Sequence, residues 1–144
     1  MELKRISPEE AKELLDSDAG YVYVDVRSIP EFDAGHAPGA KNIPIMHRSN
    51  MGMQPNGDFV AVCEKALGKD AKIITACLKG GRSMRAAQML MASGFTDVVD
   101  MRGGFMGEPD PMGGAEYPGW QPRGLPVTTD AADDETYAGL SRSE

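Results

Sequence analysis

The sequence has little of what marks disulfide-bonded, metal-binding or membrane-spanning proteins. It contains two cysteines, Cys63 and Cys77, and two well-separated histidines, His36 and His47. Two cysteines are too few for a disulfide framework, and no CxxC or cysteine–histidine spacing predicts a metal site. No apolar run approaches the length of a membrane span, and the N-terminus lacks the apolar stretch of a secretory signal. We therefore expect a cytoplasmic protein that needs no metal or other cofactor.

Positive charge is also scarce, because the formal net charge is −7 and the sequence pI is about 4.8. Nucleic acids and anionic membranes select basic surfaces, so we expect neither as a partner. The length of 144 residues suits one domain, which we place at residues 1–127. Residues 128–144 are acidic, small and polar, which predicts a disordered tail. We expect a monomer or a weak dimer.

Segments typical of strands alternate with segments typical of helices along the chain. The expected strands cover residues 21–26, 40–43, 71–76 and 97–100. The expected helices follow the capping residues Ser7 and Ser28 and cover residues 59–67 and 83–93. This alternation predicts a parallel sheet with helices on both faces. The stretches 46–58 and 106–120 are rich in methionine and glycine, and we expect surface loops there, with contact to a partner or substrate as the alternative.

Cys77 lies directly after an expected strand, at the start of a short glycine-containing loop that leads into an expected helix. Such a loop directs backbone N–H groups and the positive end of the helix dipole toward its centre, which favours a thiolate over a thiol. The two glycines permit a tight turn, and Lys79 and Arg82 add positive charge. These features predict that Cys77 is a nucleophile. Cys63 lies on the apolar stripe of an expected helix, which predicts a core residue.

Several motifs of the chain resemble the signature of rhodanese-like domains. The central motif, Cys77-x-x-Gly80-x-Arg82-Ser83, is similar to the active-site loop of that family. The flanking motifs that resemble the family are Val24-Asp25-Val26-Arg27, Glu31-Phe32, Gly35-His36, Pro38-Gly39-Ala40, Asn42-Ile43-Pro44, Gly94-Phe95, Gly103-Gly104 and Gly124-Leu125-Pro126-Val127. The resemblance covers roughly residues 4–127, and several motifs in the right order are far more specific than any one of them.

The resemblance implies a rhodanese-like α/β fold, with a five-stranded parallel sheet flanked by helices on both faces. It also implies a sulfurtransferase in which Cys77 takes a sulfane sulfur from a donor as a persulfide and passes it to a thiophilic acceptor. Donor and acceptor would be small molecules, such as thiosulfate and cyanide, or proteins. Lys79 and Arg82 would attract an anionic donor. Main-chain N–H groups would bind the persulfide, from the loop residues Leu78, Lys79, Gly80, Gly81, Arg82 and Ser83.

Other residues within these motifs are expected to support the structure rather than to react. Asp25 and Arg27 are expected to form a polar pair near the loop. Glu31 is interpreted as a helix-capping residue and His36 as a hydrogen-bonded structural residue. Trp120 is expected to cover the core.

Two other function classes are compatible with such a loop. Cysteine-dependent phosphatases and arsenate reductases resemble the pattern Cys-x5-Arg, often with histidine before the cysteine. Here four residues separate Cys77 from Arg82 and Ala76 precedes the cysteine, so the loop is short for a tetrahedral oxyanion. The other alternative is a non-catalytic binding module of the same fold, which the presence of Cys77 disfavours.

Overall fold

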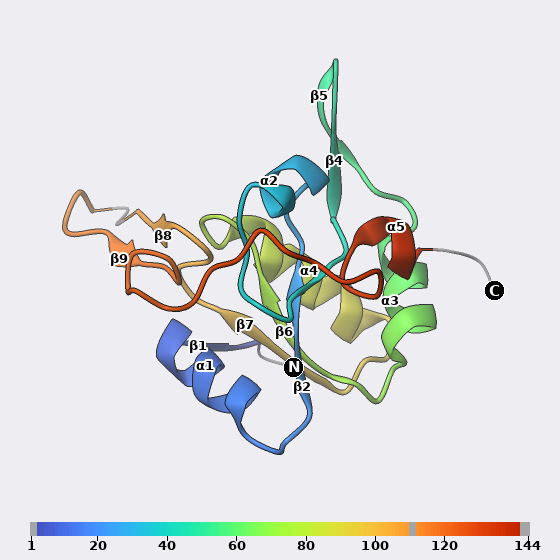
Figure 1. Ribbon diagram of the computed structural model, residues 1–144, viewed down its shortest axis with the longest axis horizontal. Helices are drawn as coiled ribbons and strands as arrows, with labels where there is room; N and C mark the ends of the chain where they lie inside the picture. The colour runs from blue at the N-terminus through green and yellow to red at the C-terminus, as the bar shows by residue number, and fades with distance from the viewer. Residues whose placement is uncertain (1–2, 110–111, 142–144) are drawn as a thin grey trace.

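The computed structural model describes residues 3–109 and 112–141 and contains a five-stranded sheet of order β1-β7-β6-β2-β3, in which every pairing is parallel (Figure 1). Its strands are β1 (Lys4–Ile6), β2 (Tyr21–Asp25), β3 (Lys41–Asn42), β6 (Lys72–Ala76) and β7 (Asp97–Met101). The helices are α1 (Pro8–Asp16), α2 (Ile29–Asp33), α3 (Phe59–Leu67), α4 (Gly81–Ala92) and α5 (Tyr137–Leu140). The antiparallel hairpins are β4 (Met46–Ser49) with β5 (Gly52–Pro55), and β8 (Gly107–Glu108) with β9 (Tyr117–Pro118).

Helices cover both faces of the five-stranded sheet, which confirms the expected fold class. On one face, Val24 and Ile73 pack with apolar residues of α3 and α4. On the other face, Tyr23 and Ile74 pack with residues of α1 and α2 and with Trp120, which is buried in the core as expected. Successive strand residues point to opposite faces, so each central strand contributes to both cores. No helix in the described parts of the chain is both long and apolar enough to cross a bilayer.

Two helices begin at serine–glutamate capping boxes that the sequence predicts. At α1, Ser7 Oγ accepts a hydrogen bond from Glu10 N at 3.1 Å, and Glu10 Oε1 accepts one from Ser7 N at 3.0 Å. At α2, the backbone N and the Oγ of Ser28 donate to Glu31 Oε1 at 3.1 and 2.8 Å. Such bonds satisfy polar groups that a helix start leaves without an intrahelical partner.

Three segments in which we expected no strand contain short ones. β1 pairs with β7 and supplies the fifth strand of the sheet. The expected loop at 46–58 contains the β4–β5 hairpin, which extends away from the rest of the ribbon (Figure 1). The stretch 106–120 contains the β8–β9 hairpin. Each of these strands has two to four residues, so an alternating apolar pattern has too few positions to be recognised.

The C-terminal segment differs from the disordered tail that its composition predicts. Within residues 128–141, which we call the C-terminal strap, Glu135 O accepts a hydrogen bond from Asn42 N at 2.8 Å. The helix α5 packs Tyr137 and Leu140 against the core. These anchors are backbone groups and two side chains, which composition does not reveal. The strap thus contacts the domain that we placed at residues 1–127, and the last three residues of the expected tail lie outside the described residues.

Candidate active site

The carboxyl ends of β2, β6 and β7 lie side by side, and Cys77 directly follows the central one of these strands. Gly80 N donates a hydrogen bond to Cys77 Sγ at 3.0 Å. The same sulfur lies 3.4 Å from Ser83 Oγ, and the Ser83 hydroxyl lies 3.3 Å from Gly80 O. The loop between β6 and α4 is therefore closed around the Cys77 sulfur.

Gly80 has a backbone conformation that disfavours any residue with a side chain, and two side chains lie close to it. Its φ is +106°, in the left-handed region that residues with a Cβ rarely adopt. A Cβ at this position would lie 2.7 Å from Glu108 Oε1 and 3.0 Å from Arg5 Nη2. This turn aims the Gly80 amide at the sulfur, so the loop geometry depends on the glycine.

The first amides of α4 have no hydrogen-bond acceptor in the described part of the chain. The first backbone bond of the helix runs from Met84 N to Gly80 O at 3.3 Å, which leaves the amides of Gly81, Arg82 and Ser83 free. A helix start carries a positive partial charge and unpaired donors, so it binds anions readily. Among the loop residues expected to bind a persulfide, Gly80 has its amide within hydrogen-bonding distance of the sulfur. The amides of Gly81, Arg82 and Ser83 have no partner in the described residues.

A second glycine, Gly104, lies against the backbone of the Cys77 loop, and the two residues after Gly104 donate hydrogen bonds to that backbone. Phe105 N donates to Cys77 O at 2.7 Å, and Met106 N donates to Leu78 O at 3.0 Å. A Cβ on Gly104, whose φ is +61°, would lie 2.5 Å from Cys77 O and 2.7 Å from Leu78 O. The glycine pair at this position belongs to a motif noted in the sequence, but that it touches the Cys77 backbone follows only from the three-dimensional fold.

Asp25 and Arg27 form the polar pair that we expected, and both side chains are buried. Arg27 Nη2 donates to Asp25 Oδ2 at 2.7 Å, and its Nε lies 3.0 and 3.1 Å from the two carboxylate oxygens. The same Nη2 donates to Gly35 O at 2.7 Å. The guanidinium lies 4.3 Å from the centre of the Phe105 ring. The Asp25–Arg27 pair does not touch the Cys77 loop directly. It contacts Phe105, whose amide donates a hydrogen bond to Cys77 O.

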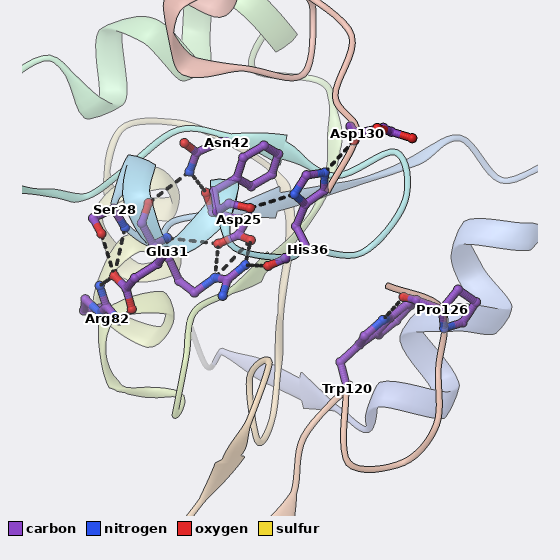
Figure 2. Close-up of polar contacts among 12 residues, drawn as sticks. Asp25, Ser28, Glu31, His36, Asn42, Arg82, Trp120, Pro126 and Asp130 are labelled. Atoms are coloured by element: carbon purple, nitrogen blue, oxygen red, sulfur yellow. Dashed lines mark hydrogen bonds and ion pairs between the residues drawn. The ribbon is translucent and has the colours of Figure 1, made fainter. Parts of the chain in front are cut away.

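Glu31 links the start of α2 to the first turn of α4 (Figure 2). Arg82 Nη1 and Nη2 donate to the two carboxylate oxygens at 2.8 and 3.0 Å, in addition to the bonds from Ser28. Burial alone would raise the pKa of Glu31, but the hydrogen bonds from Arg82 and Ser28 outweigh it and lower the pKa from 4.5 to about 2. The charge of Arg82 is thus compensated, whereas Lys79 is exposed and forms no ion pair within the described residues.

A buried carboxylate that we did not predict lies behind the loop. Asp100 accepts hydrogen bonds from Arg5 Nε at 2.9 Å and from Thr75 Oγ1 at 3.0 Å. Burial raises the pKa of Asp100, and hydrogen bonds from Ser83, Arg5 and Thr75 oppose that rise. Since Ser83 also contacts Cys77 Sγ, a polar chain runs from Arg5 to the sulfur. Its members come from β1, β6, β7 and α4, and no local pattern connects them.

His36 has the structural role that the sequence predicts. Its Nδ1 lies 2.8 Å from Phe32 O, and its Nε2 lies 2.9 Å from Asp130 O in the C-terminal strap (Figure 2). The imidazole stacks on the Phe32 ring with 3.7 Å between centroids. His36 therefore fastens the strap to the domain.

The two cysteines have different environments. Cys63 is fully buried in α3, and burial raises the pKa of its thiol from 9.0 to about 12. The Cys77 residue is 2% exposed, and two hollows flank its loop. One hollow is lined by residues that include Arg27, Leu78 and Phe105, and the other by residues that include Met46, Met53 and Arg82. Glu31 lines both hollows.

Comparison with known proteins identifies the family. The model of the rhodanese-like domain matches residues 7–107, so the chain belongs to the rhodanese-like domain family. Thiosulfate sulfurtransferase 16, chloroplastic, of Arabidopsis thaliana is 41% identical over 109 residues, which are 76% of this chain and 81% of the relative. Thiosulfate sulfurtransferase GlpE of Pseudomonas fluorescens (strain SBW25) is 39% identical over 104 residues, which are 72% of this chain and 83% of the relative.

A solved structure supports the same fold. The crystal structure of Rv0390 from M. tuberculosis superimposes with a TM-score of 0.73 at 25% sequence identity and covers 90% of this chain and 100% of its own. The name of the plant relative includes the word chloroplastic, so the cytoplasmic location expected for this chain stays a prediction.

Proposed function

We propose that this chain is a sulfurtransferase that carries sulfane sulfur as a persulfide on Cys77. The observation that carries the proposal is the Gly80 amide 3.0 Å from Cys77 Sγ, beside the unpaired first amides of α4. A negatively charged outer sulfur bound at this loop would gain hydrogen-bond donors and the positive end of a helix. The two relatives named thiosulfate sulfurtransferases, at 41% and 39% identity, support the same activity.

The reaction has two half-reactions. First, the Cys77 thiolate attacks the outer sulfur of a donor such as thiosulfate, the S–S bond of the donor breaks, and sulfite leaves with the bonding electrons. Second, cyanide or an acceptor thiolate attacks the outer sulfur of the persulfide, and the Cys77 thiolate is released. One neutral sulfur atom moves in each half-reaction, so no external oxidant or reductant is needed.

The charged residues near the loop have different roles in this proposal. Lys79 attracts an anionic donor, since its charge is not compensated by an ion pair in the described residues. Arg82 mainly fixes the first turn of α4 through Glu31, because the two carboxylate oxygens already occupy its guanidinium. Small donors would approach the loop through the hollow lined by Arg27, Leu78 and Phe105, in which Leu78 is the residue directly after Cys77.

A phosphatase or arsenate reductase is the less well supported alternative. Its anion would need space and a free arginine at the loop, whereas Arg82 is bound by Glu31 and follows Cys77 after only four intervening residues. Turnover of an aryl phosphate or of arsenate by the wild-type protein, lost in Cys77→Ser, would favour that alternative.

Intact-protein mass spectrometry after incubation with thiosulfate or a polysulfide tests the proposal. We expect one added sulfur atom, which cyanide removes. The Cys77→Ser variant should take up no sulfur, whereas Cys63→Ser should take it up normally, because burial keeps the Cys63 thiol protonated. Sulfur on Cys63 in the Cys77→Ser protein, with none on Cys77 in the wild type, would refute the assignment.

A further inference from the structure

A groove runs between α4 and the β4–β5 hairpin, next to the Cys77 loop. Two adjoining hollows form it, and Met46 and Arg82 line both of them. We call it the methionine–arginine groove, after lining residues that also include Met53, Met89, Arg48 and Arg85. Since Arg82 belongs to the loop as well as to the groove, anything bound in the groove lies beside the sulfur site.

The base of the hairpin is fixed to the domain, so one wall of the groove is held in place. Asn56 Nδ2 donates to Pro44 O at 2.8 Å and to the Tyr137 hydroxyl at 3.1 Å. The His47 ring lies 5.3 Å from the Tyr137 ring. The far end of the hairpin instead exposes 86% of Met51 and 39% of Met53 to solvent.

The groove has positive charge that the chain does not compensate. Arg48 and Arg85 are exposed and form no ion pair in the described part of the protein. The negative charge of Glu31, which also lines the groove, is taken up by Arg82. In a chain of net charge −7, such a local excess of positive charge selects a ligand with negative charge.

The apolar lining restricts the ligand further. Methionine side chains are flexible and polarizable, and they adapt to apolar groups of different shapes. Thiosulfate or cyanide would gain nothing from such a surface along the hairpin. A peptide segment with acidic side chains for the arginines and apolar side chains for the methionines matches both properties.

We propose that the methionine–arginine groove docks the protein that accepts sulfur from Cys77, through an acidic and partly apolar segment that carries the accepting cysteine. This proposal rests on the proposed sulfurtransferase function. The acceptor thiolate attacks the outer sulfur of the persulfide, a new S–S bond forms on the acceptor, and the Cys77 thiolate leaves as the old S–S bond breaks. The total charge and the oxidation level are conserved.

Two synthetic cysteine-bearing peptides test the proposal, one with aspartate and glutamate around leucine and cysteine, the other with asparagine and glutamine in their place. We expect the persulfide-loaded protein to transfer sulfur about 5- to 10-fold faster to the acidic peptide at low salt, with the preference reduced at about 0.5 M salt. In the double variant Arg48→Ala/Arg85→Ala the preference should disappear. Transfer to free cysteine should stay at the wild-type rate, because neither arginine bonds to the Cys77 loop.

The control variant Lys4→Ala/Lys72→Ala removes the same charge from exposed residues at the first positions of β1 and β6. Lys72 lies at the opposite end of β6 from Cys77, and Lys4 lies on β1, the outer strand at the opposite side of the sheet from β3. Neither lysine lines the groove, so the control should keep the preference. A preference that survives in the arginine variant would overturn the proposal. Equal losses in the lysine and arginine variants would also overturn it, because they would indicate a general effect of net charge.

Binding of the acidic peptide with serine in place of cysteine, followed by fluorescence anisotropy, separates the two proposals. Sulfur loading of Cys77 without tighter binding of this peptide to the wild type than to the arginine variant would overturn the docking proposal alone. Peptide binding without sulfur loading would support the docking surface but overturn its role in sulfur exchange. Co-sedimentation with phosphatidylserine vesicles that depends on the two arginines, without peptide binding, would assign the groove to a membrane and overturn the proposal.

Discussion

The carboxylate of Glu31 offers a quantitative test of how the loop is held. Its pKa falls from 4.5 to about 2 in the folded protein, because the bonds from Arg82 and Ser28 outweigh the effect of burial. Without solvent screening, a shift of this size corresponds to about 3 kcal/mol of folding free energy. The side chains of Arg82 and Glu31 are 23% and 22% exposed, so solvent screening reduces the contribution to about 1–2 kcal/mol.

We therefore expect Glu31→Gln to lower the free energy of unfolding at pH 7 by about 1–2 kcal/mol. Because the folded pKa lies below the unfolded one, the stabilisation is complete above the unfolded value of 4.5 and is lost as the pH falls toward 2. Roughly 40% of it remains at pH 3. Urea unfolding of the wild type and of Glu31→Gln at pH 7, 5 and 3, followed by the fluorescence of Trp120, measures the difference between their unfolding free energies. We expect this difference to shrink as the pH falls.

The chain contains a matched control in the capping box of α1. Glu10 accepts the same backbone hydrogen bond from Ser7, but it forms no ion pair with an arginine in the described residues. Glu10→Gln thus reports helix capping without Arg82, and we expect a smaller loss and a weaker pH dependence. Equal losses in the two variants, or a difference for Glu31→Gln that does not change with pH, would refute the role assigned to the Glu31–Arg82 pair.

Three further predictions concern the loop and its support. Gly104→Ala should slow sulfur loading, measured by mass spectrometry, by about 100-fold or more, because the new Cβ displaces the backbone of Cys77; an unchanged rate would contradict this contact. Arg27→Met should lower the unfolding free energy by about 3–5 kcal/mol, since it leaves the buried Asp25 carboxylate unpaired, and a loss below about 1 kcal/mol in urea unfolding would refute it. Lys79→Ala should weaken use of thiosulfate more than use of a neutral polysulfide, most clearly at low salt, and equal losses in initial rates would exclude anion attraction.

Much of the fold could be predicted from local signals. The capping boxes at Ser7 and Ser28 mark the starts of two helices, and the β-branched runs mark the central strands. β1 could not be predicted, because three residues are too few for a period and its pairing with β7 joins segments almost a hundred positions apart. The strap escaped prediction because part of its attachment uses the carbonyls of Asp130 and Glu135, which every residue type possesses. Composition also does not show that Tyr137 and Leu140 pack against the core.

The candidate site was predictable where its residues are close in sequence. Cys77, Gly80 and Ser83 belong to one motif, and the structure brings them into contact. The roles of Gly104 and Asp100 depend on the approach of β7 and its following turn to the loop. Neither the Gly103-Gly104 motif nor the sequence around Asp100 indicated that these residues lie next to the loop. The pairing of Arg82 with Glu31 was missed for the same reason, since the two residues are 51 positions apart.

The strap also has a consequence for how the molecule meets copies of itself. β3 is an outer strand of the sheet, and an outer strand with unpaired amides is a template on which another chain can add a strand. The strap lies along the free edge of β3. Glu135 O accepts a hydrogen bond from the outward-facing amide of Asn42, and Asp134 O accepts one from Lys41 Nζ at 2.9 Å. A protein shortened at residue 127 would expose the edge of β3 to solvent. We expect such a protein to self-associate by strand addition at this edge.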